Sequence, residues 1–126
     1  MLNVVDVCTR LRTFGYDVID DDVITVDYLC RKVEQDINTY CNIEEPPEEL
    51  RFRATDAVCG EFLQQKLIKG ELPNIDKVLR SVSSIREGDT QVTFGGNQTY
   101  EQLLAAKLDA LELRTSDLNR FRRFPW

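Results

Sequence analysis

The fold is decided by the stretch from residue 46 to residue 70, PPEELRFRATDAVCGEFLQQKLIKG. At helical spacing its apolar residues fall on two opposite faces. One face holds Leu50, Ala54, Ala57, Val58, Phe62 and Ile68, and the other holds Phe52, Cys59, Leu63 and Leu67. A helix with one side in water shows a single apolar stripe, so this pattern predicts a central helix with packing partners on both sides.

The two ends of this helix carry suitable terminal residues. Pro47 fits a first-turn position, where its missing N–H costs nothing, and Glu48 and Glu49 suit the positive end of the helix dipole. Lys66 near the other end, followed by Gly70, is typical of a helix C-terminus.

Three further amphipathic helices are predicted around it. The first covers residues 3–14 and ends before Gly15, and the second covers 22–41, capped by an aspartate of the Asp20–Asp22 run. A short loop from Asn42 to Pro47 predicts that the second and central helices are antiparallel neighbours. The last begins at the capping box of residues 99–102. The apolar stripes are Val4, Val7, Cys8, Leu11 and Phe14; Val26, Leu29, Cys30, Val33, Ile37, Tyr40 and Cys41; and Tyr100, Leu103, Leu104, Leu108 and Leu111.

A β-hairpin is predicted at about residues 82–94, with no more than one helical turn between Gly70 and the hairpin. Apolar and polar residues alternate on both sides of the turn EGDT at 87–90. An isolated hairpin is barely stable in water, so the face made by Ile85, Val92 and Phe94 must be covered. It rests either on the helices of its own chain or on a neighbouring subunit, and both readings stay open.

We therefore expect a mainly α protein, a small four-helix bundle-like domain with one β-hairpin and an extended C-terminal tail. Residues 1–114 form the helical domain, and residues 115–126 form the tail. At 126 residues the chain fits one domain. No apolar run approaches the ~20 residues that cross a bilayer, and the first residues do not resemble a signal peptide. We expect the protein to stay where it is made or to travel inside a larger particle.

Candidate chemistry is sparse. The four cysteines lack CxxC spacing and the chain has no histidine, which favours buried reduced thiols over zinc sites or disulfides. The Asp20–Asp22 run and the acidic corner of Glu44, Glu45, Glu48 and Glu49 are better read as solvated charges than as metal or acid–base sites. Gly95-Gly96 lacks the context of a phosphate loop. We expect no enzyme activity, no cofactor and no metal.

The C-terminal tail is the feature that a plain globular domain would not need. Residues 114–126 hold four arginines and one aspartate, whereas the rest of the chain holds 12 basic and 21 acidic residues. The chain ends on Trp126, its only tryptophan, and both Arg and Trp are enriched at interface hot spots. The tail can fold back on its own bundle, stack on single-stranded nucleic acid, or dock into a partner, which we favour.

Several segments, in order and spacing, resemble the head–tail connector (adaptor, or head-completion) proteins of tailed bacteriophages. They are INTYCN at 37–42 leading into Pro46-Pro47, VCGEFL at 58–63, SSIREGDTQVTF at 83–94 and FRRFPW at 121–126. The resemblance covers about the last hundred residues. Relatives tend to carry a tyrosine before the paired arginines and no proline before the last aromatic, so Phe121 and Pro125 depart from the pattern.

The resemblance implies a structural virion protein without a catalytic centre, located at the neck of the virion and in the host cytoplasm during assembly. It implies a homo-oligomeric ring, dodecameric to match the portal, that binds the portal protein and the next neck or tail-completion protein. DNA would pass through the channel of the ring without specific binding, and the protein would not contact a membrane. We expect portal contacts from Arg120, Phe121, Arg122, Arg123, Phe124 and Trp126, and inter-subunit contacts from Ile85, Val92 and Phe94.

A second reading stays open beside this one. The chain could be a non-virion helical regulatory or nucleic-acid-binding protein, with Arg120, Arg122 and Arg123 contacting DNA or RNA. The net charge of −6 argues against a general nucleic-acid binder.

Overall fold

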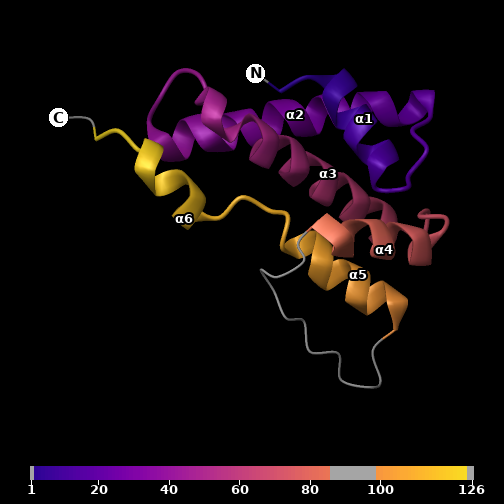
Figure 1. The fold of residues 1–126 in the computed structure, drawn as a ribbon. Coiled ribbons are helices and arrows are strands. Elements are labelled where there is room, and N and C mark those ends of the chain that lie inside the picture. Colours follow the sequence, from indigo (N-terminus) through magenta and orange to yellow (C-terminus); the bar gives the residue numbers. More distant parts are fainter. Residues whose placement is uncertain (1, 86–98, 125–126) are drawn as a thin grey trace.

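The computed structural model describes residues 2–85 and 99–124, and this part of the chain is mainly helical (Figure 1). The elements, in order, are α1 (Val4–Thr13), α2 (Asp20–Cys41), the 3₁₀ turn η1 (Glu48–Leu50), α3 (Arg51–Ile68), α4 (Ile75–Ile85), α5 (Tyr100–Asp109), α6 (Thr115–Leu118) and the 3₁₀ turn η2 (Asn119–Phe121). The mainly α prediction is confirmed.

Helix α3 is the centre of the molecule, as the two-faced pattern predicts. It contacts α1, α2 and α5, and its middle is buried on nearly all sides. The buried residues are Ala54, Thr55, Ala57, Val58, Cys59, Gly60, Phe62 and Leu63. Two predicted core positions were wrong, because Phe52 is 81% exposed and Ile68 is 85% exposed. Both lie near the ends of α3, where the neighbouring helices no longer cover it.

Helices α2 and α3 run antiparallel, as the short connecting loop predicts. Asp22 Oδ1 in the first turn of α2 lies 2.9 Å from Lys66 Nζ near the end of α3. Farther along α2, Lys32 Nζ lies 2.7 Å from Glu61 Oε1 of α3. The residue that caps the C-terminus of α2, Asn42, adopts the left-handed conformation (φ 57°). Asparagine accepts this conformation more readily than most residues, so the loop can reverse the chain here.

Helix α4 replaces the first strand of the predicted hairpin. Ser83 and Ile85 lie in α4 and not in a strand, and the rest of the predicted hairpin, residues 86–94, lies outside the described residues. Val78 and Val82 of α4 are buried, and α4 packs against α5. Val78, Val82 and Ile85 recur at helical spacing, and this signal outweighs the short alternation that suggested a strand.

Helix α5 closes the core on the other side of α3. Its capping box forms as predicted, because Thr99 Oγ1 accepts from Gln102 N at 3.2 Å and Gln102 Oε1 accepts from Thr99 N at 3.1 Å. Leu104, Leu108 and Leu111 are buried, but the predicted core residue Tyr100 is exposed. Tyr100 is the first residue of the helix and lies beyond the part that α4 and α3 cover.

Candidate docking tail

The first part of the predicted tail packs on the helical body. Leu118 of α6 is buried, and its carbonyl oxygen accepts a hydrogen bond from Cys41 Sγ at 3.6 Å. Tyr40 Oη donates to Asn119 Oδ1, which ties η2 to the last turn of α2. Phe121 is half-buried and packs against the core. Residues 115–121 are therefore a root that fixes where the tail leaves the body.

One backbone hydrogen bond marks the end of this root. The backbone N–H of Arg123 donates to the carbonyl oxygen of Cys41 at 2.7 Å. Phe124, the next residue, is 59% exposed, and Figure 1 shows the chain leaving the end of the bundle here. Trp126, which the sequence singles out, lies outside the described residues. The described part of the tail is therefore tied to the body at Arg123 and exposed at Phe124.

Two tail arginines, Arg120 and Arg122, lie against aromatic rings. The Arg122 guanidinium carbon lies 5.1 Å from the ring centre of Tyr40 and 5.8 Å from that of Phe124, and the Arg120 guanidinium carbon lies 4.8 Å from the ring centre of Phe121. Cations over ring faces are attracted by the ring quadrupole. These contacts hold the long arginine side chains in defined positions.

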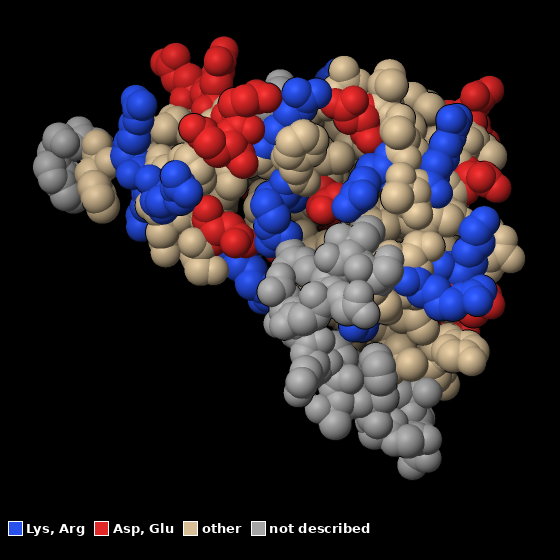
Figure 2. Space-filling model, viewed as in Figure 1, with Lys and Arg blue, Asp and Glu red and all other residues tan. Residues whose placement is uncertain are grey.

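The acidic corner and the basic tail, which the sequence presents as separate features, meet in space. They form the walls of a hollow of about 730 Å³. Its charged lining residues are Glu44, Glu45 and Glu49 on the loop side and Arg120, Arg122 and Arg123 on the tail side. Figure 2 shows acidic side chains grouped beside the basic ones at this end of the molecule. Carboxylates of the loop therefore lie across this hollow from the tail guanidinium groups.

Of the predicted inter-subunit residues Ile85, Val92 and Phe94, only Ile85 lies within the described residues. Ile85 is the last residue of α4. Val92 and Phe94 lie outside the described residues, so the predicted shared face of Ile85, Val92 and Phe94 stays a prediction.

The cysteines are all free thiols. Cys30, Cys41 and Cys59 are buried, and Cys8 is half-buried. Burial raises the pKa of the Cys30 thiol to about 11, and it raises the pKa of Cys59 further. A thiol with a raised pKa is a poor nucleophile and metal ligand near neutral pH, so these side chains act as small core residues. Within residues 2–85 and 99–124, no cluster of Cys, Asp and Glu could hold a metal ion.

A buried polar network near the start of α2 was not predicted. Asp22 Oδ2 accepts from Tyr16 Oη at 2.7 Å and from Ile19 N at 3.1 Å, and Asp22 Oδ1 pairs with Lys66 Nζ at 2.9 Å. Burial by itself raises the pKa of Asp22, but these hydrogen bonds outweigh burial and lower it overall. The network joins α2 to α3 and is structural. Its sequence signal is weak, because Asp22 is the third residue of an apparently solvated run.

Comparisons with known proteins identify no relative: no protein-family model, no curated protein and no solved structure matches the chain. None of the helices in the described part of the chain is both long enough and apolar enough to cross a bilayer.

Proposed function

We propose that the protein is a structural subunit of the head–tail connector of a tailed bacteriophage. In this proposal the subunits form a ring between the portal and the neck or tail, each subunit anchors to the portal through its C-terminal tail, and DNA passes through the ring. The finer architecture belongs to the same proposal: a bundle-like body and a tail that reaches another protein.

The exposed end of the tail is the observation that carries the proposal. A basic aromatic terminus that served only its own core would be covered, yet Phe124, which follows the backbone bond of Arg123 to Cys41, is mostly exposed. Arg120, Arg122 and Arg123 are then available to acidic grooves of a partner, and exposed aromatic rings add contact area.

The charge distribution also supports passage of DNA. Outside residues 115–126 the chain carries 21 acidic and 13 basic residues, so a channel lined by this body would repel the phosphate backbone. The genome could then slide through without being held.

Portal binding by a shortened chain tests the proposal. We would delete residues 124–126, because Arg123 makes the last backbone hydrogen bond to the body among the described residues. Purified wild-type and shortened proteins would be mixed with the candidate portal, and the products would be separated by size and imaged by electron microscopy. We expect rings on the portal with the wild-type chain, loss of these rings with the shortened chain, and the same melting temperature for both chains.

A charge-matched pair of variants sharpens this test. Arg120→Ala with Arg123→Ala removes two tail charges, whereas Arg31→Ala with Arg80→Ala removes two exposed charges from the body. We expect only the tail pair to weaken portal binding, by at least tenfold. Equal loss in both variants would mean that net charge, and not the tail, drives the interaction. Full binding by the shortened chain would contradict the proposal.

The second candidate function rests on the same arginines. Clustered guanidinium groups beside aromatic rings are also found in proteins that bind single-stranded nucleic acid. Such binding would weaken steeply with salt and would be lost in the Arg120→Ala, Arg123→Ala variant. An electrophoretic mobility shift at moderate salt distinguishes the two functions, because a connector subunit is expected to retain little nucleic acid.

A further inference from the structure

An exposed apolar pair lies on the outer face of α2. Ile24 is 79% exposed and Tyr28 is 62% exposed. The two residues are one helical turn apart and lie on the side of α2 opposite Val26 and Leu29, which are buried in the core. Because most of each side chain lies in solvent, they contribute little to the packing of their own subunit, and together they form a small apolar ridge.

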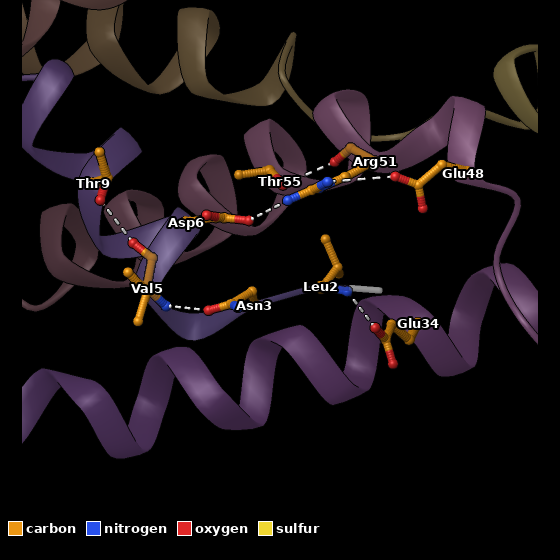
Figure 3. Close-up of polar contacts among 9 residues, drawn as sticks. All are labelled: Leu2, Asn3, Val5, Asp6, Thr9, Glu34, Glu48, Arg51 and Thr55. Carbon is orange, nitrogen blue, oxygen red and sulfur yellow. Dashed lines mark hydrogen bonds and ion pairs between the residues drawn. The ribbon is translucent and has the colours of Figure 1, made fainter.

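A groove of about 470 Å³ lies between α1 and α3. Its lining residues are Asp6, Thr9, Arg10 and Thr13 from α1 and Arg51, Phe52, Thr55 and Asp56 from α3. Ion pairs cross between the two walls, from Arg51 to Asp6 at 2.9 Å and from Arg10 to Asp56 at 2.7 Å (Figure 3 shows the first). The charges of the walls are therefore balanced within the subunit, and an occupant does not have to supply an opposite charge inside the groove.

The groove is less polar than its residue types suggest. Each threonine hydroxyl donates to the carbonyl oxygen four residues earlier: Thr9 to Val5 at 2.9 Å, Thr13 to Thr9 at 3.2 Å and Thr55 to Arg51 at 2.8 Å. Figure 3 shows two of these bonds. The methyl groups remain for other contacts, beside the exposed ring of Phe52. Such a lining suits aliphatic and aromatic side chains.

The charges around the two surfaces are complementary. The acidic residues Asp20 and Asp21 precede Ile24 by about one turn and make no ion pair with described residues. On α1, Val5, Thr9 and Arg12 share one face, and both Val5 and Arg12 are exposed. Arg12 makes no ion pair within the described part of the chain. Among the described residues, the ridge therefore has unpaired anions beside it, and the face of α1 that reaches the groove at Thr9 carries an unpaired cation, Arg12.

We propose that the ridge of Ile24 and Tyr28 on one copy of the chain docks in the α1–α3 groove of a second copy. Asp20 and Asp21 of the first copy then lie toward Arg12 of the second. Because the two surfaces differ and lie on different elements, the contact is head-to-tail, and it repeats from copy to copy until a ring closes or a filament grows. The inference deepens the proposed function and takes its biological meaning from it, but its test does not involve the portal or the tail.

Two variants that each block one surface test the contact. The ridge variant is Ile24→Ser with Tyr28→Ser, and the groove variant is Thr9→Gln with Phe52→Ser. These side chains are exposed, so both variants should keep the wild-type melting temperature. The matched control is Ile68→Ser, which removes an equally exposed side chain outside both surfaces.

The readout is mass as a function of concentration, measured by sedimentation or light scattering on the full chain. We expect the wild type and the control to assemble, and each blocked variant alone to show at least a tenfold weaker association. An equimolar mixture of the two blocked variants is expected to form a one-to-one dimer that does not grow, because it holds one intact ridge facing one intact groove.

Other outcomes overturn the proposal. A wild-type chain that stays monomeric at all concentrations removes the contact altogether. Assembly of the groove variant alone would indicate a symmetric contact of ridge with ridge, and assembly of both variants would place the interface elsewhere. Loss of portal binding on deletion of residues 124–126 would leave this result unaffected, so the two proposals can fail separately.

Discussion

Helices α2 and α3 lie side by side in one core, yet they bury their side chains in different ways. Helix α2 has one buried stripe, formed by Asp22, Val26, Leu29, Cys30, Val33, Ile37 and Cys41, and its other faces meet solvent. In the middle of α3 the buried residues are nearly consecutive and include Ala, Gly and Cys. The difference shows what a central helix requires: small residues let several helices approach, and large ones fill the space between them.

The largest expected effect breaks the packing around α3. Phe62 is buried, and the centre of its ring lies 5.3 Å from the centre of the Tyr16 ring in an edge-to-face contact. We expect Phe62→Ala to lower the free energy of unfolding by about 3–5 kcal/mol, since the cavity cannot be filled from α1, α2 and α5. Urea denaturation measures this change. Phe52→Ala in the same helix is the control, and a similar loss there would contradict the burial that distinguishes the two rings.

The second effect concerns the ion pair between Asp22 of α2 and Lys66 of α3. We expect Asp22→Asn to cost about 2–3 kcal/mol at pH 7, because Lys66 loses its buried carboxylate partner. The folded state lowers the pKa of Asp22, so the stability that its charge provides is present above the unfolded pKa of about 3.9. It is lost as pH falls through the folded pKa.

Urea denaturation at pH 7 and at about pH 3 measures this dependence. The difference in stability between wild type and Asp22→Asn should shrink as the medium becomes acidic. Glu71→Gln is a control, because Glu71 also pairs with Lys66, at 3.3 Å, but is exposed. If the difference stayed constant with pH, the charge of Asp22 would not be what stabilises the contact between α2 and α3.

A smaller effect tests the close approach that α3 makes on its α5 side. A Cβ at Gly60 would lie 2.9 Å from Leu111 Cβ and 3.1 Å from the carbonyl oxygen of Leu108. We expect Gly60→Ala to destabilise the protein by about 1 kcal/mol, because the cost of overpacking exceeds the gain in helix propensity. Thermal unfolding compares it with Gln64→Ala, one turn farther along. A stabilised Gly60→Ala protein would mean that α5 shifts easily.

The smallest effect on stability is expected on the outer face of α2. Ile24→Ala should change the free energy of unfolding by no more than about 0.5 kcal/mol, since Ile24 contributes little to its own core. Denaturation at low protein concentration measures this change in the free energy of unfolding without a contribution from self-association. A loss above about 1 kcal/mol would show that the outer face of α2 is packed within the subunit.

Helices with one buried side could be predicted from the sequence. The stripes of α1 and α2 recur at helical spacing, and Gly15 (φ 91°) and Asn42 (φ 57°) have the left-handed backbone that ends a helix. Helix α4 was not predicted, because the alternation around Ile85 resembled a strand, whereas Val78 and Val82 pack on α5. A segment this short fits both the two-residue repeat of a strand and the repeat of about 3.6 residues of a helix, and packing against α5 decided that it is a helix.

The candidate site was predicted in part. The basic aromatic composition of the tail marks it as unusual, but it does not reveal that Leu118 belongs to the core or that Arg123 N bonds Cys41 O. Nor does the sequence place the acidic corner beside the tail, since Glu45 and Arg120 are far apart along the chain. Such pairs depend on how α2 and the C-terminal segment meet.

By itself the sequence determined the helical class, most helix ends and the contrast between an acidic body and a basic end, because periodicity, capping and charge are local properties. Only the tertiary structure decided which exposed apolar residues are left without a partner and where the tail separates from the core. Burial depends on which helices cover a given face, and that coverage is set by contacts between segments distant in the chain.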